Sequence, residues 1–268
     1  MRASDTLSFD PVLRCGAYIC LRVPAACQAA MADADVPALA ERLGLRNEYD
    51  AGGGPEQSIA YLRRVSAVPG QVSDDGLLGA EAIVHVAAME PELIAEFRAG
   101  LARLLGPAVT PRILGGDMRL GGYTGQAMFN FAYRERVLQQ PAAAMPNAFL
   151  VPMSKTAEWW KKDWMERHTY FLPRYDDAGA MRSQGHALAA AAGIPCLLRR
   201  TYKNPAEPAA DGDFDFVTYF ECADAGVPVF HDVCNALRDV TRNPEWAFVR
   251  EGPTWHGRRT ATWGELVS

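Results

Sequence analysis

The apolar residues of the chain follow two repeating patterns, one typical of helices and one typical of strands. Over residues 91–105 and 227–240 they recur every three or four positions, which predicts two amphipathic helices. A short run rich in β-branched and aromatic residues precedes each helix, at 78–89 and 214–223, and predicts a strand. Each predicted helix therefore follows a strand directly along the chain.

The remaining elements give both halves of the chain the same order. Each half opens on a strand, a helix and a second strand, and closes on a last strand after its long helix. The expected ranges are 16–23, 36–43, 58–68 and 111–123 in the first half, and 147–153, 176–191, 194–202 and 246–263 in the second. The order β-α-β-β-α-β, occurring twice, is that of a duplicated ferredoxin-like unit. The predicted fold class is therefore α+β, with two tandem ferredoxin-like modules.

A Pro- and Ala-rich stretch near residue 139 interrupts the pattern and indicates a boundary between the halves. We expect an N-terminal module over 1–143 and a C-terminal module over 144–268. The polar and aromatic stretch 161–177 does not fit the bare module, so we interpret it as an insertion into the second half.

Composition narrows the class of protein. The chain has 268 residues, is 49% hydrophobic and carries a net charge of −5 without a Lys/Arg-rich run. This balance argues against nucleic acid or an anionic membrane as the main partner. The N-terminal sequence lacks the apolar region of a secretory signal, and the six cysteines form no C-x-x-C pair, so we expect reduced thiols and a cytoplasmic location.

The five histidines lack the spacing of the common zinc-protease motif, and neither G-x-S-x-G nor a P-loop occurs. His186 has a distinctive setting, because it ends a predicted helical stretch and stands thirteen residues before Arg199 on a predicted strand. A neutral imidazole in such a place can bind a haem iron, and an arginine can hold an anion above the metal. A buried structural histidine is the competing interpretation.

Residues 147–263 resemble the haem-binding half of the chlorite dismutase family, which also includes the coproheme decarboxylases. The matching blocks are VPMSKTAEWW from Val151, the isolated His186, LRRTY from Leu198, DFVTYFE from Asp215 and VREGPTWHG from Val249. The first half agrees with the family only in pattern and length. The resemblance implies a haem b protein with a dimeric α+β barrel fold, haem in the C-terminal module, and assembly into a homo-oligomer.

The resemblance also assigns residues by position. His186 matches the proximal iron ligand, the metal-binding residue, and Arg199 matches the distal arginine, the catalytic residue. Five further residues match cofactor-binding positions beside the haem or, for the first, near a propionate: Lys155, Trp159, Trp160, Thr218 and Phe220. His168 competes for the ligand role, and close to the haem it could instead act as a distal acid or base.

Several departures bear on the activity. Coproheme decarboxylases carry a reactive tyrosine where this chain has Val151, and they typically lack the distal arginine. Chlorite dismutases place a glutamate behind the proximal histidine, and here Glu245 is a candidate only after a shift in the alignment. Without such a partner the imidazole would be less basic and the iron potential higher. The 161–177 insertion could reshape the pocket for a larger substrate.

The favoured function is therefore that of a haem-dependent oxidoreductase of chlorite dismutase type, which converts chlorite to chloride and O2 while Arg199 retains the hypochlorite intermediate. The second hypothesis is a haem-dependent biosynthetic or peroxidase-like enzyme acting on an organic substrate, such as an N–O or N–N compound. The third is a haem-binding protein without turnover, and the fourth is a haem-free barrel whose histidines are structural. The expected partner is a small molecule, either a small anion or an organic compound.

Overall fold

The structure, a computed structural model, describes residues 15–48, 57–65, 79–106, 112–117 and 145–268. Its centre is a ten-stranded sheet in which β6 pairs with both β10 and β12, so that the sheet closes on itself. Around the closed ring the neighbouring strands are antiparallel. In order they are β6 (Asn147–Lys155), β10 (Phe216–Cys222), β9 (Leu198–Lys203), β5 (Arg112–Asp117), β1 (Cys15–Leu21), β4 (Ala82–Ala88), β3 (Ser58–Arg64) and β12 (Trp255–Thr260).

Two short strands extend the ring. β2 (Arg46–Asn47) lies parallel to β3, and β11 (Val249–Glu251) lies antiparallel to β6. Closure removes the free edges of the main strands, which would otherwise offer unpaired backbone groups to other chains.

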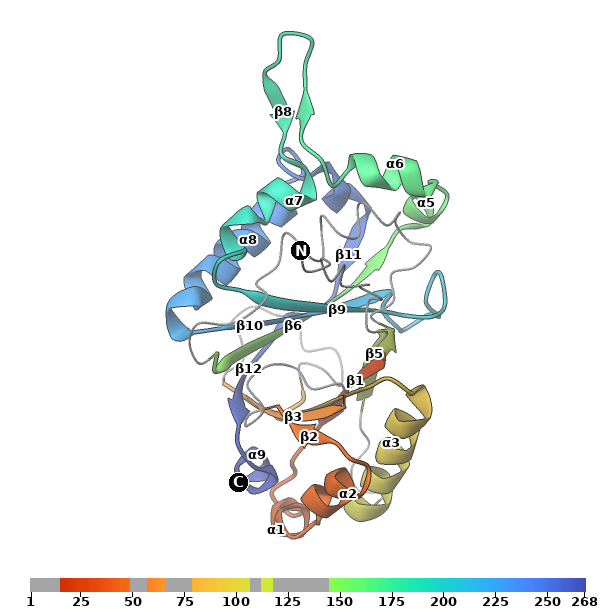
Figure 1. The fold of residues 1–268 in the computed structure, drawn as a ribbon, viewed down its shortest axis with the longest axis vertical. Coiled ribbons are helices and arrows are strands. Elements are labelled where there is room, and N and C mark those ends of the chain that lie inside the picture. Colours follow the sequence, from red (N-terminus) through yellow and green to blue (C-terminus); the bar gives the residue numbers. More distant parts are fainter. Residues whose placement is uncertain (1–14, 49–56, 66–78, 107–111, 118–144) are drawn as a thin grey trace, which may run out of the picture.

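Helices cover the outer faces of the two halves, as Figure 1 shows. The strands of the first half pack on α1 (Gln28–Ala32), α2 (Val36–Arg42), α3 (Pro91–Leu105) and the C-terminal α9 (Trp263–Val267). The second half carries α5 (Ala157–Trp160), α6 (Trp164–Thr169), α7 (Gly185–Ala189), α8 (Val227–Arg238) and the 3₁₀ helices 191–193, 224–226 and 244–248. The mixed α+β class with an antiparallel sheet is thereby confirmed.

The two long helices occur where the apolar spacing predicts them. Helix α3 begins at Pro91, whose fixed φ suits the first helical turn, and ends before Gly106 at φ 70°. Its Ile94, Phe97 and Leu101 are buried against the sheet. Helix α8 buries the equivalent stripe in the second half, including Phe230 and Val233.

Two expectations are wrong. Residues 176–191 do not form a continuous helix: β7 (Arg174–Tyr175) and β8 (Met181–Ser183) make a projecting hairpin (Figure 1), and only α7 is helical in front of the 3₁₀ turn. Gly179 and Gly185 have φ values of 79° and 66°, which interrupt a right-handed helix. The predicted last strand, 246–263, is likewise divided into a 3₁₀ helix, β11, β12 and α9.

Side chains alternate across the ring, and this alternation separates the three largest apolar cores from one another; a fourth, smaller cluster surrounds Trp159. One core lies inside the closed sheet and contains Tyr18, Leu150, Tyr219 and Trp255. The other two lie between the outer faces and the helices of each half. The expected module boundary at 143/144 and the end of the 111–123 strand fall outside the described residues. The six cysteines all lie within the described residues, and none of them forms a disulfide bond.

Among the described residues, no helix has both the length and the apolar character needed to cross a bilayer.

Candidate functional site

A cavity lies on the outer face of β6, β9 and β10, beneath α7 and α8. Together with the open solvent at its mouth it comprises about 970 Å³ of empty space. Most of its walls are apolar, whereas a small number of polar side chains converge on it. The lining residues with a charged, imidazole or hydroxyl side chain are Lys155, His186, Arg199, Thr201, Thr218, Glu245 and Glu251.

His186 enters the cavity from the first turn of α7. The preceding Gly185 has a positive φ, and a Cβ there would lie 2.4 Å from the carbonyl oxygen of Leu172, so only glycine fits this approach. The backbone N–H of His186 donates to the carbonyl of Tyr170 at 3.0 Å, which ties the start of α7 to the end of α6. The histidine is thus held by backbone geometry before its side chain makes any contact.

The imidazole is oriented by a carboxylate. His186 Nδ1 lies 2.8 Å from Oε2 of Glu245, in the 3₁₀ helix 244–248. When Nδ1–H donates a hydrogen bond to Glu245, Nε2 carries a lone pair. This is the tautomer of a neutral histidine that binds a metal through Nε2. Glu245, which the sequence offered only as a shifted candidate, therefore contacts the imidazole of His186 directly.

Lys155 completes a chain of three residues. Its Nζ donates to Oε1 of Glu245 at 2.5 Å and lies 4.3 Å from the centre of the Trp159 ring. Burial alone would raise the pKa of Glu245, but the Lys155 ammonium and the hydrogen bonds from Lys155 and His186 outweigh it and lower the pKa to about 2. The carboxylate is consequently ionised at neutral pH, and the Lys155 ammonium is directed at Glu245.

The sheet supplies the opposite wall of the cavity. Arg199 and Thr201 point outward from β9, and Thr218 and Phe220 do so from the neighbouring β10. The hydroxyl oxygens of Thr201 and Thr218 are 3.3 Å apart. A cationic guanidinium and two hydroxyl groups therefore share one face with apolar side chains, and this combination suits a small anion or a polar ligand head.

The predicted site residues separate into two groups. Those lining the cavity are Lys155, His186, Arg199, Thr218 and Phe220. Trp159 and Trp160 do not line it. Trp159 is fully buried in a cluster with Phe171 and Phe216, and Trp160 Nε1 donates to Asp215 at 3.3 Å. Because Phe171 and Phe216 line the cavity, the two tryptophans form a layer behind its wall.

His168 is not among the lining residues. It belongs to α6, and its ring centre lies 5.0 Å from that of Trp164 in an edge-to-face arrangement. Of the two histidines that competed for the ligand role, His186 is the one at the cavity.

Some lining residues were not singled out from the sequence: Met153, Thr201, Phe216, Cys234, Trp246 and Glu251. Strand alternation could have found three of them. Met153 shares the outer face of β6 with Val151, Thr201 follows Arg199 by two positions, and Phe216 precedes Thr218 by two. Nothing local in the sequence indicates the other three.

No protein-family model and no curated protein matches the chain. Among solved structures, the chlorite dismutase of Candidatus Nitrospira defluvii in complex with imidazole aligns with 97% of this chain and 95% of its own, at 19% identity and a TM-score of 0.67. A tryptophan-to-phenylalanine variant of that enzyme in complex with cyanide covers 100% and 98%, at 18% identity and a TM-score of 0.65. TA0507, provisionally assigned as a chlorite dismutase, covers 95% and 98%, at 13% identity and a TM-score of 0.59.

These alignments show that the chain has the fold of the chlorite dismutases. The resemblance read from residues 147–263 is confirmed at this level, and the likeness extends over the first half, where the sequence agreed only in pattern and length. At such identities the likeness concerns the fold alone, so activity has to be argued from the site.

Proposed function

We propose that this chain is a haem b-dependent oxidoreductase resembling chlorite dismutase. The observation that carries the proposal is the placement of His186, with Nδ1 held by Glu245, in an apolar cavity whose opposite wall bears Arg199. The donor set fits haem, because a neutral imidazole is a proximal ligand for haem iron and apolar walls suit the porphyrin faces. His186 would ligate the iron through Nε2, while Phe171, Phe216 and Phe220 would contact the ring.

When bound, haem would supply an iron centre that exchanges electrons and an oxygen atom with a small oxidised anion. The protein's own contribution begins behind the histidine. Glu245 would accept a hydrogen bond from Nδ1–H of His186, which raises the electron donation of the imidazole and favours the oxidised metal. Lys155 keeps Glu245 ionised in a buried place, so we assign it to this chain of residues in preference to a propionate contact.

Arg199 would bind the chlorite anion and retain the hypochlorite intermediate until chloride and O2 form. A guanidinium suits this task because it stays protonated at any working pH and presents several donors in a fixed plane. Thr201 and Thr218 would donate or accept hydrogen bonds at the same face. The apolar residues around them exclude bulk water, which strengthens the attraction between the guanidinium and an anion.

The wall residue Val151 favours this activity over decarboxylation. Val151 is buried and lines the cavity, so an aliphatic group stands where the resemblance places the reactive tyrosine of coproheme decarboxylases. The described lining residues include no tyrosine. We therefore assign Arg199 as the catalytic residue and give no catalytic role to a tyrosine of the cavity wall.

The wider expectations remain part of the proposal. We propose two tandem ferredoxin-like modules, 1–143 and 144–268, with haem in the second, in a cytoplasmic homo-oligomer that acts on a small molecule. The repeated order of a strand, helices, paired strands, a long helix and a last strand supports the two modules.

The test is the visible spectrum of the purified chain after reconstitution with haem, followed by addition of chlorite in an oxygen electrode. A Soret band with rapid O2 release supports the proposal. Haem binding without O2 release would refute chlorite turnover and favour the organic substrate. Failure to bind haem would refute the proposal as a whole.

A further inference from the structure

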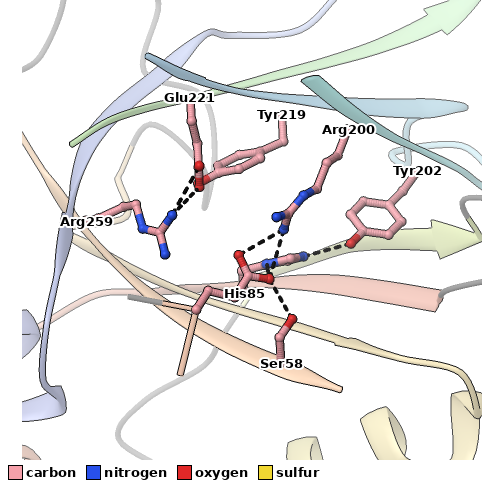
Figure 2. Close-up of polar contacts among 8 residues, drawn as sticks. Ser58, His85, Arg200, Tyr202, Tyr219, Glu221 and Arg259 are labelled. Atoms are coloured by element: carbon pink, nitrogen blue, oxygen red, sulfur yellow. Dashed lines mark hydrogen bonds and ion pairs between the residues drawn. The ribbon is translucent and has the colours of Figure 1, made fainter. Parts of the chain in front are cut away.

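A cluster of aromatic and charged side chains fills part of the interior of the closed sheet (Figure 2). The ring of Tyr18 stacks on that of His85, with centroids 4.5 Å apart. Tyr202 and Tyr219 lie 5.6 and 5.5 Å from Tyr18 between ring centres. Each of the four residues is at most 1% exposed. Three phenols thus form a contiguous group that is sealed from solvent.

Two of the three phenols are hydrogen-bonded to a group that can take a proton. The hydroxyl of Tyr202 lies 2.9 Å from Nε2 of His85. Nδ1 of the same ring faces the Glu48 carboxylate at 3.8 Å, which favours the proton on Nδ1 and leaves Nε2 as the acceptor. The Tyr219 hydroxyl donates to Oε1 of Glu221.

Two arginines pair with the two carboxylates that lie next to the phenols. Arg200 Nη1 donates to both oxygens of Glu48, at 2.8 and 2.9 Å. Arg259 Nη1 donates to both oxygens of Glu221 at 3.1 Å (Figure 2). Burying four charged groups costs free energy that an apolar interior would not, so packing alone does not account for this arrangement.

The cluster lies directly behind the wall of the haem cavity. On β10, Thr218 and Phe220 line the cavity while Tyr219 between them points into the interior. On β9, Thr201 lines the cavity and its neighbour Tyr202 belongs to the interior. A single strand layer therefore separates the two phenols from the cavity.

We infer that Tyr219 and Tyr202, linked through Tyr18, are a redox relay that delivers electrons to the haem cavity when hydrogen peroxide reacts there. This inference rests on the proposed function, since haem is the group through which the cavity would reduce the peroxide. Hydrogen peroxide is the oxidant, and it needs two electrons and two protons to become two molecules of water.

Each phenol supplies one electron. At Tyr219 the O–H bond breaks, the proton passes to Glu221 and the ring is left as a neutral radical. At Tyr202 the proton passes to Nε2 of His85 and the electron leaves in the same way. Solvent supplies two protons to the peroxide, so two phenols and one peroxide give two phenoxyl radicals and two waters.

The proton acceptors His85 and Glu221 are needed because burial opposes ionisation of the phenols. Burial raises the pKa of Tyr18 and that of Tyr219 well above the ordinary value, so neither ionises at neutral pH. Oxidation must then be coupled to proton transfer along an existing hydrogen bond. Within the described part of the chain the Tyr18 hydroxyl has no hydrogen-bond partner, so Tyr18 serves as a bridge between the two others.

The experiment uses the haem-reconstituted full chain mixed with hydrogen peroxide, freeze-quenched and measured by electron paramagnetic resonance. Ring-deuterated tyrosine identifies a tyrosyl signal by its narrowing. We expect a tyrosyl radical in the wild type and its loss in the double variant Tyr202→Phe/Tyr219→Phe, which keeps both rings. Glu221→Gln, which keeps Tyr219 and removes its base, should slow the appearance of the signal.

Tyr61→Phe is the matched control. Tyr61 is buried at 4% exposure on β3, but it packs against Trp263 in the outer core of the first half. Its variant should keep the full signal. Three outcomes would overturn the relay: an unchanged signal in the double variant, no tyrosyl signal in the wild type, or loss of the signal in Tyr61→Phe. If the Soret band is normal in those cases, the proposed function still stands. Absence of the Soret band would overturn both.

Discussion

His186 Nδ1 and Glu245 Oε2 are 2.8 Å apart although 59 residues separate them in sequence. The contact brings α7 and the 3₁₀ helix 244–248 together at the edge of the cavity, and Glu245 in turn binds Lys155 from β6. One carboxylate thereby connects three separate segments of the C-terminal half. The same group sets the tautomer of the imidazole and neutralises a buried ammonium, so its loss should affect both haem chemistry and folding.

Replacement of His186 tests the metal ligand. We expect His186→Ala to lose the Soret band of the reconstituted protein and to regain it with added imidazole, which can enter the vacated space. His168→Ala is the control, because His168 lies on α6 away from the lining of the cavity. Titration with haem, followed by absorbance, measures both variants. The opposite pattern, with His168→Ala losing the band, would reverse the assignment.

Glu245→Gln should destabilise the fold and raise the reduction potential of bound haem. The change leaves the Lys155 ammonium buried without its anion, at a cost of about 3–5 kcal/mol in the free energy of unfolding. Urea denaturation and redox titration provide the two readouts. Glu251→Gln is the matched control: Glu251 also lines the cavity, but its partner Arg238 is partly exposed, so we expect a loss below about 1 kcal/mol. Equal losses in both variants would contradict the role given to Glu245.

Replacement of the two adjacent arginines should affect different properties: O2 release for Arg199 and folding stability for Arg200. Arg199→Ala should keep haem and most of the folding stability but release less O2 per chlorite, since the anion is no longer held. Arg200→Ala should destabilise the fold by about 3–5 kcal/mol, because it leaves Glu48 buried without its cation. An oxygen electrode and urea denaturation distinguish the two effects. If Arg199→Ala matches the wild type in O2 yield and in lifetime during turnover, Arg199 has no part in the reaction.

Stability should fall steeply in acid. Burial opposes ionisation of Glu48 and Glu245, but Arg200 beside the first and Lys155 beside the second lower each pKa from 4.5 to about 2. Because these folded-state pKa values are depressed, the stabilisation is complete above pH 4.5 and is lost as the pH falls toward 2. Each carboxylate contributes up to about 1.4 kcal/mol per pH unit in this range.

Urea denaturation between pH 6 and pH 3 measures this dependence. We expect Glu48→Gln to flatten the curve in acid, because one of the two depressed carboxylates is gone. A wild-type curve that is flat down to pH 3 would show that the two carboxylates are not held in the ionised form by their partners.

Gly185→Ala should disturb the site without touching a catalytic group. A side chain at this position is strained by the positive φ and meets the Leu172 carbonyl at 2.4 Å. We expect a destabilisation of about 1–3 kcal/mol and weaker haem binding, because α7 must shift and carries His186 with it. Gly179→Ala is the control: Gly179 has a φ of 79° at the hairpin turn with nothing within 4 Å of an added Cβ, so it should cost stability but leave haem affinity unchanged.

Local patterns determine which parts of this fold can be predicted from the sequence. The helices at 91–105 and 227–238 follow from apolar spacing, because a helix of this length buries one continuous stripe. A helix over 176–191 is predicted because the many small residues of this segment fit helical spacing. It does not form, because Gly179 and Gly185 adopt left-handed backbone angles that composition does not reveal.

The site shows the same division. His186, Arg199, Thr218 and Phe220 could be named from the resemblance, and all four line the cavity. The pairing of His186 with Glu245 could not be derived, since no spacing rule joins residues on separate elements. The placement of Trp159 behind the wall also depends on the full packing of its neighbours.

Strand β9 carries the two neighbouring arginines on opposite faces, one toward the cavity and one toward the sheet interior. Because side chains alternate with a period of two, sliding β9 by one residue against β10 would exchange Arg199 with Arg200 and Thr201 with Tyr202. The cavity would then receive a phenol, and Arg200 would turn away from Glu48. A single inserted or deleted residue within 198–203 would therefore damage folding and chemistry at once, so the length of this strand is constrained by both.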